Sequence, residues 1–176
     1  MKKSIYALVL ASFLFSCGGD DDPVATHEVG EWELDSYILT NVPSDYSFNE
    51  GRIFAVNEIS FGGIVFESYE VTFNVDKTYA RTVGVTGPDI KDNGTWELDG
   101  DDLTLSSEDF DDDEEYEVER NEDDQLWWSV SSQFSLLEDA IADTITQEYI
   151  DSITDEEFFA LFDPVTVDLV YAFERK

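Results

Sequence analysis

Apolar and polar residues alternate along much of the chain after residue 29, with the two-residue period of a half-buried β-strand. The clearest stretch is YEVTFNVDKTYARTV (69–83), in which Tyr69 and Phe73 share one face. Only Asp76 and Lys77 separate this run from the next one. Two alternating runs joined by a two-residue connection predict a β-hairpin.

Comparable runs occur before and after this stretch, and those between residues 94 and 130 follow one another at short intervals. They are GEWELDSYIL (30–39), GTWELD (94–99), DLTLS (102–106), EYEVER (115–120), QLWWSV (125–130) and TVDLVYAFER (166–175). Each has a polar face, which indicates an antiparallel sheet with one side in water. A chain of 176 residues is long enough for one domain with its own core, so we expect a single, mostly β domain.

One segment departs from this period. In FSLLEDAIADTITQEYI (134–150) apolar residues recur every three or four positions, as on one face of an α-helix. Thr154 and Glu157 have the spacing of a capping box at the start of a second helix. The sequence therefore predicts a helical insertion at about 134–163, before the last strand.

The first residues have the pattern of a secretory signal peptide. Lys2 and Lys3 precede an uninterrupted apolar run at 5–15, and the small residue Ser16 follows it. As a helix this run would be about 16 Å long, roughly half of the ~30 Å hydrocarbon core of a bilayer. We therefore expect residues 1–16 to be a signal peptide and not a permanent membrane span.

The single cysteine of the chain, Cys17, follows directly. The stretch LFSC (14–17) resembles the lipobox of bacterial lipoproteins, in which the cysteine thiol receives diacylglycerol and becomes the first mature residue. The acidic run after Cys17 resembles the signal that sends lipoproteins of the Bacteroidetes to the outer face of the outer membrane. These resemblances imply a lipid on Cys17, a flexible acidic tether at 17–28, and a protein anchored in the outer membrane and exposed at the cell surface.

The charge of the chain is strongly negative. Removal of residues 1–16 would take away Lys2 and Lys3 and none of the 42 acidic residues, so the formal net charge would change from −33 to −35. Such a surface repels phosphate backbones, which argues against nucleic-acid binding. The charge either serves solubility, for example in salty surroundings, or attracts cations or a basic partner.

Groups that carry common catalytic chemistry are scarce. His27 is the only histidine, and it lies in the expected tether, so a Ser-His-Asp or Cys-His arrangement has no base. The chain also lacks the cysteines and histidines of a zinc site and the glycine-rich loop of a phosphate site. We therefore expect a protein that is not an enzyme and that holds no cofactor.

Carboxylates are dense over residues 99–124. Oxygen ligands of this kind suit calcium. Asp109, Asp111 and Asp113 have the spacing of the first ligands of an EF-hand loop. Glu114 then stands where that loop needs glycine, and Arg120 where it needs glutamate. This departure predicts diffuse attraction of counterions and no specific metal site, and calcium-dependent ordering is kept as a further hypothesis.

Two pairs of tryptophans have readable positions. GEWELD (30–35) and GTWELD (94–99) differ at one residue, and we interpret them as two strands in which a glycine permits a tight entry and the tryptophan closes an end of the core. Trp127 and Trp128 are adjacent in an expected strand, so their side chains point to opposite faces. One fills the interior, and the other is covered by the helical segment or is exposed for stacking with a sugar or a partner.

Several segments in this order resemble the lipocalin-like domain of Bacteroidetes lipoproteins. They are Gly30-x-Trp32, VTFNVDKTYAR (71–81), GTWELDGDDLTL (94–105) and YAFERK (171–176). The resemblance implies a single antiparallel up-and-down β-barrel of about eight strands over residues 29–176. It also implies that Gly30, Trp32 and Arg175 close one end, with the guanidinium of Arg175 on the indole of Trp32.

Barrels of about eight strands either hold one small ligand or are filled by their own side chains. The first hypothesis is a cell-envelope lipoprotein that binds or carries a small apolar or amphipathic molecule. The alternative is a non-enzymatic interaction module with a filled barrel, whose acidic hairpins or exposed tryptophan contact a partner or calcium. The helical insertion would cover an end or edge of the barrel, or form a lid over a ligand cavity.

Overall fold

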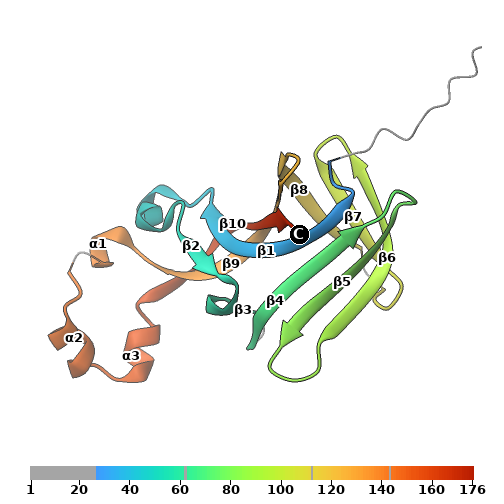
Figure 1. Ribbon diagram of the computed structural model, residues 1–176. Helices are drawn as coiled ribbons and strands as arrows, with labels where there is room; N and C mark the ends of the chain where they lie inside the picture. The colour runs from blue at the N-terminus through green and yellow to red at the C-terminus, as the bar shows by residue number, and fades with distance from the viewer. Residues whose placement is uncertain (1–26, 62, 112, 143) are drawn as a thin grey trace, which may run out of the picture.

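The computed structural model describes residues 27–61, 63–111, 113–142 and 144–176 (Figure 1). Strands make up most of this part of the chain, with short helices between some of them. The elements are β1 (Gly30–Thr40), η1 (Ser44–Asn49), β2 (Ile53–Ala55), η2 (Val56–Glu58), β3 (Ser60–Phe61), β4 (Ile64–Phe73), β5 (Thr78–Val85), β6 (Ile90–Asp99), β7 (Asp102–Ser107), β8 (Glu114–Asn121), β9 (Gln125–Leu137), α1 (Asp139–Ala142), α2 (Gln147–Ser152), α3 (Asp155–Phe159) and β10 (Phe162–Arg175).

Eight of the strands, β1 and β4 to β10, form a closed antiparallel barrel (Figure 1). From β4 to β10 each strand pairs with the next one along the chain, and β10 then pairs with β1. The circle closes because Gly30 and Trp32 of β1 lie opposite Phe73 and Val71 of β4. The expected mostly β fold, an up-and-down barrel of about eight strands with a helical insertion before the last one, is confirmed.

The two ends of the barrel differ because β1 changes its partner along one edge. Residues 30–33 pair with β4, whereas residues 36–38 pair with the short strand β2. We call the end where β1 starts and β4 ends the closed end, and the opposite end the mouth. At the mouth β1 and β4 no longer pair, and β2 lies beside β1 in place of β4.

Aromatic side chains fill the barrel at the closed end. Trp32, Phe73, Trp96, Trp128 and Phe173 are almost completely buried. The ring centroids of Phe73 and Trp96 are 5.3 Å apart, and those of Trp128 and Phe173 are 4.3 Å apart. These edge and tilted contacts are the arrangements that aromatic pairs prefer, so this half of the interior is a packed core.

The two similar strands place their tryptophans in matching environments. The indole N–H of Trp32 donates to the carbonyl of Glu28 at 2.7 Å, and that of Trp96 donates to the carbonyl of Asn74 at 3.2 Å. Each bond satisfies a buried donor with backbone from the turn that precedes or neighbours the strand. Gly30 has a φ of +152°, a conformation that favours glycine, and the guanidinium of Arg175 occupies the space that a Cβ would need.

The helical insertion lies at the tip of the long hairpin that β9 and β10 form, away from the barrel (Figure 1). It contacts η1, where Asp139 accepts hydrogen bonds from the hydroxyl of Ser47 at 2.6 Å and the backbone N–H of Phe48 at 3.0 Å. None of the described residues between 138 and 161 belongs to the buried core. The expectation that the insertion covers an end or edge of the barrel is therefore wrong, and so is the alternative of a lid over its interior.

The insertion is also shorter than expected at its start. Phe134 to Leu137 belong to β9, where Phe134 lies opposite Val165 and Leu137 opposite Phe162. Apolar spacing over four residues fits a strand as well as a helix, and pairing with β10 decides between them. The second predicted helix start has the expected capping box, since Thr154 accepts from the N–H of Glu157 and Glu157 accepts from that of Thr154. Within the described ranges no helix is long and apolar enough to cross a membrane.

Candidate functional site

A cavity of about 270 Å³ lies inside the barrel toward the mouth, and we call it the mouth cavity. Its place follows from the strand register. Phe73, the last residue of β4, pairs with Gly30 at the closed end, and Tyr69 and Phe66 lie four and seven residues earlier in the strand, toward the mouth. The walls are Phe66, Tyr69, Arg81, Val83, Ile90, Asp92, Phe110, Glu114, Tyr116 and Tyr171. Five strands and one loop therefore contribute to a mixed apolar and polar lining.

Charged residues occupy inward positions in three of these strands. Along β5 the inward side chains are Tyr79, Arg81 and Val83, in the alternation that a strand imposes. The same rule turns Asp92 of β6 and Glu114 of β8 inward. The sequence analysis missed these groups, although continuing the alternation from Tyr79 would have marked Arg81 as an interior residue.

Arg81 binds both carboxylates. Its Nε is 2.8 Å from Oδ2 of Asp92, and its two terminal nitrogens are 2.5 and 2.7 Å from the two carboxylate oxygens of Glu114. The side chains of Arg81 and Asp92 are 10% and 1% exposed, whereas that of Glu114 is 39% exposed. The bidentate geometry with Glu114 is the strong form of an arginine–carboxylate pair.

Both carboxylates stay ionised in this setting. Burial opposes ionisation of Asp92, but hydrogen bonds from Ser107 and Tyr79 and the charge of Arg81 outweigh it, so the pKa of Asp92 is lowered. Burial likewise opposes ionisation of Glu114, and hydrogen bonds from Arg81 and Tyr116 lower its pKa. With Arg81 as the basic residue among the lining residues, the walls carry one excess negative charge.

Three tyrosines of the cavity lining, Tyr69, Tyr116 and Tyr171, lie near the charged groups. The hydroxyl of Tyr116 donates to Oε2 of Glu114 at 2.7 Å, and Arg81 donates to the hydroxyl of Tyr69 at 3.3 Å. The ring of Tyr171 lies 6.0 Å from that of Tyr116 and 6.3 Å from that of Tyr69. Burial raises the pKa of each of the three hydroxyls, so these groups remain neutral.

The residues expected to close the barrel lie together at the other end. The guanidinium carbon of Arg175 is 4.4 Å from the ring centroid of Trp32, and its nitrogens donate to the backbone carbonyls of His27 at 2.8 Å and Val29 at 3.1 Å. A further bond joins Arg175 to the carbonyl of Asp123. This cluster fixes the ends of the domain to each other and contributes nothing to the mouth cavity. Cys17 lies outside the described residues.

The adjacent tryptophans point to opposite sides, as predicted. Trp128 is fully buried beneath the mouth cavity, with ring centroids 5.4 Å from Tyr116 and 6.4 Å from Tyr171. Trp127 is half-buried on the outside, where the guanidinium carbon of Arg120 lies 4.0 Å from its ring centroid. Arg120 from the neighbouring strand, and not the helical segment, is what covers Trp127.

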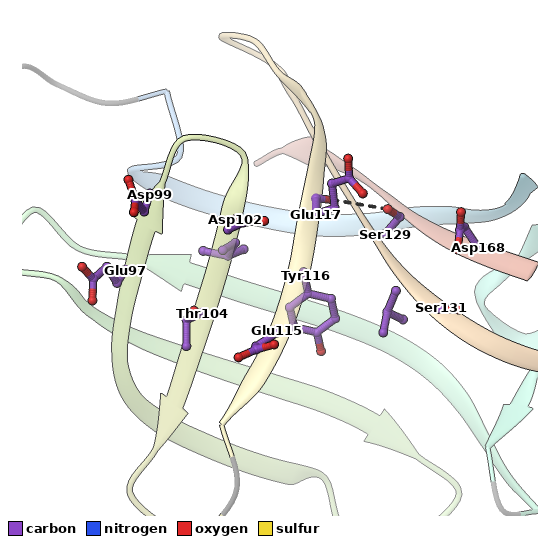
Figure 2. A pocket seen from close by; sticks show the side chains of 12 residues that line it. Glu97, Asp99, Asp102, Thr104, Glu115, Tyr116, Glu117, Ser129, Ser131 and Asp168 are labelled. Carbon is purple, nitrogen blue, oxygen red and sulfur yellow. Dashed lines mark hydrogen bonds between the residues drawn. The ribbon is translucent and has the colours of Figure 1, made fainter. Parts of the chain in front are cut away.

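A second hollow lies on the outside of the barrel, and we call it the outer groove. Figure 2 shows the side chains that line it, which come from β6 to β10. It measures about 750 Å³ and carries six carboxylates, those of Glu97, Asp99, Asp102, Glu115, Glu117 and Asp168. The outward positions of the same strands that turn Asp92 and Glu114 inward therefore form a strongly acidic surface.

The three aspartates with EF-hand spacing do not line this groove. Asp109, Asp111 and Asp113 are all exposed, and they precede β8. Among the described residues no group of three or more histidine, cysteine, aspartate or glutamate side chains is placed to hold a metal ion. Asp109, Asp111 and Asp113 thus lie on the surface, and in the described part of the chain they do not form a metal site.

Comparison with known proteins identifies the family. No curated protein and no solved structure matches the chain. A family model described as a lipocalin-like domain matches residues 29–128, which is more than half of the 176 residues. The match covers the barrel from β1 into β9, including all the acidic and basic groups of the mouth cavity. The chain belongs to the family of lipocalin-like domains.

Proposed function

We propose that this chain binds one small amphipathic molecule in the mouth cavity. The observation that carries the proposal is the division of the interior into a packed closed end and a cavity of about 270 Å³ above it. Apolar walls with a few polar groups at defined places are typical of small-molecule sites. The lining has this character, since Phe66, Val83 and Ile90 lie beside the hydroxyls and charges described above.

A native mass spectrum tests this function. The chain from residue 18 onward, purified gently from a bacterial periplasm, is expected to carry a discrete extra mass that is lost on denaturation. Val83→Phe, which fills part of the cavity, should remove that mass, whereas Thr82→Phe on the outward side of the same strand should keep it. A bare protein mass in the unsubstituted chain would contradict the proposal.

The proposed setting is the cell envelope, with the chain held on the outer membrane by a lipid on Cys17. The support is the pattern of the first seventeen residues, a charged start, an apolar run and a small residue before the cysteine. Radiolabelled palmitate should enter the unsubstituted protein and not the Cys17→Ala variant. Label that persists in the variant would refute the assignment.

A second candidate function uses the outer groove as a docking surface for a basic partner. The observation in its favour is the concentration of six carboxylates from neighbouring strands on one face (Figure 2). Trp127 is a poorer candidate for stacking because Arg120 covers its ring. Charge reversal with Glu115→Lys and Glu117→Lys should then abolish binding of a lysine-rich peptide, and unchanged binding would count against this function.

A further inference from the structure

We propose that the ligand of the mouth cavity is a small organic cation, an ammonium group on an apolar body. This inference rests on the proposed function and goes beyond it by naming the charge that the site selects. Four features of the molecule point to it: the engagement of Arg81, the exposure of Glu114, the aromatic walls and the net charge of the chain.

Arg81 is not available to hold an anion. Its Nε faces Asp92, one terminal nitrogen faces Glu114 and Tyr69, and the other faces Glu114. An anionic ligand would have to displace one of these carboxylates. Displacing Asp92 would leave a buried carboxylate without its partner, which is strongly unfavourable. Displacing Glu114 would break its bidentate pair with Arg81.

Glu114 is the carboxylate that a ligand can reach. Asp92 is almost completely buried and already receives bonds from Arg81, Tyr79 at 2.7 Å and Ser107 at 2.6 Å. Glu114 is 39% exposed and accepts two bonds from Arg81 and one from Tyr116. Because a carboxylate offers about four acceptor positions, Glu114 can take one more donor, and an ammonium N–H supplies it together with the missing positive charge.

The aromatic walls suit the same ligand. Rings of Phe66, Tyr69, Phe110, Tyr116 and Tyr171 line the cavity. The faces of such rings attract cations, most effectively where water is excluded. Neutral tyrosine hydroxyls add no competing charge, so the walls favour an ammonium group over both a neutral group and an anion.

The charge of the whole chain acts in the same direction. A formal net charge of −33 and the six carboxylates of the outer groove raise the concentration of cations near the surface and lower that of anions. The available space sets the size of the ligand. At about 30 Å³ of liquid volume per water molecule, about 270 Å³ is room for a molecule of roughly ten non-hydrogen atoms.

Three probes of nearly equal size test the inference: benzylammonium, benzyl alcohol and benzoate. Their binding to the mature chain is measured by isothermal titration calorimetry at low and at physiological salt. Benzylammonium is expected to bind about tenfold more tightly than benzyl alcohol, and benzoate is expected not to bind. Equal binding of the cation and the alcohol, or preferred binding of benzoate, would overturn the cation inference and leave the proposed function in place. Failure of all three probes would also overturn the cation inference, and the native mass spectrum decides the proposed function separately.

A matched pair of variants locates the effect. Glu114→Gln removes the reachable charge inside the cavity, and Glu115→Gln removes the same formal charge from the outer face of the same strand. Benzylammonium should lose about tenfold in affinity with the first variant and keep it with the second, while benzyl alcohol is unaffected by either. Equal losses in both variants would mean that the net charge of the chain, and not the cavity, attracts the cation. The comparison of probes on the unsubstituted chain remains decisive even if Glu114→Gln fails to fold.

Discussion

The two ends of the barrel each contain an arginine, and the two arginines have different partners. At the closed end Arg175 bonds to backbone carbonyls and lies on the ring of Trp32. Near the mouth Arg81 bonds to the ionised carboxylates of Asp92 and Glu114. The first arginine ties chain segments together through neutral partners, and the second belongs to a charged group that lines a cavity.

The two ends therefore have different roles: the closed end stabilises the barrel, and the mouth is the candidate binding site. The closed end is filled by aromatic rings that contact each other, which leaves no space for a ligand beside them. The mouth combines space, charge and aromatic faces. Variants at the closed end should therefore affect stability alone, whereas variants at the mouth should also change pH dependence or binding.

The largest effect is expected at the centre of the closed end. Trp32→Ala removes a fully buried ring and its hydrogen bond, and it should lower the free energy of unfolding by about 3–5 kcal/mol. Val83→Ala beside the mouth cavity should cost only about 1–2 kcal/mol, since its surroundings are already open. Urea titration followed by tryptophan fluorescence measures both. Similar losses would mean that the two ends are equally well packed.

The next effect concerns the charged group. Arg81→Met leaves two carboxylates without their cation and should lower the free energy of unfolding by about 3 kcal/mol at pH 7, the low end of the usual range because Glu114 is partly exposed.

The sign of its pH dependence follows from the lowered pKa values of Asp92 and Glu114. In the unsubstituted chain these two groups contribute stability above their unfolded pKa values, and that contribution is lost as the pH falls through their folded pKa values. Without Arg81 the carboxylates take up protons more readily in the folded state. The loss of unfolding free energy in Arg81→Met, relative to the unsubstituted chain, should therefore become smaller between pH 7 and pH 5. A loss that stays constant would show that the ion pairs of Arg81 with Asp92 and Glu114 do not stabilise the fold.

Smaller effects are expected where a cation lies on a tryptophan. Arg175→Met loses bonds to exposed backbone carbonyls as well as the ring contact, and it should cost about 1–2 kcal/mol at any pH from 5 to 7.5. The Nζ of Lys77 lies 3.6 Å from the ring centroid of Trp96. Lys77→Ala should lower the free energy of unfolding by about 0.5 kcal/mol. Thermal unfolding of both variants measures the difference. An equal decrease in melting temperature would mean that the backbone hydrogen bonds of Arg175 contribute nothing to stability.

The strands of the barrel could be predicted because each one is marked by the residues of its own segment. Alternation over 69–83 and the repeated Gly-x-Trp pattern each mark a strand without reference to the rest of the chain. The short stretch 134–137 could not be assigned, since its four residues fit two periods and only the pairing with β10 decides.

The mouth cavity could not be predicted, because it depends on register between distant strands. Alternation alone turns Arg81, Asp92 and Glu114 inward. Whether they meet depends on the pairing of Arg81 with Asp92 across β5 and β6, and on the closure of the barrel that brings β8 to face them. No residue pattern in the sequence shows which residues of β5 and β6 pair or which strands face each other across the closed barrel.

The contacts of Arg175 also have a consequence for the proposed lipid anchor. By holding the carbonyls of His27 and Val29, Arg175 makes the chain enter the domain at the closed end. Cys17 is ten residues before His27, a stretch that reaches about 35 Å at most. If Cys17 carries the proposed lipid, the closed end of the barrel is the end tethered to the bilayer, and the mouth lies at the opposite end of the domain. A ligand would then enter and leave at the end that is not attached.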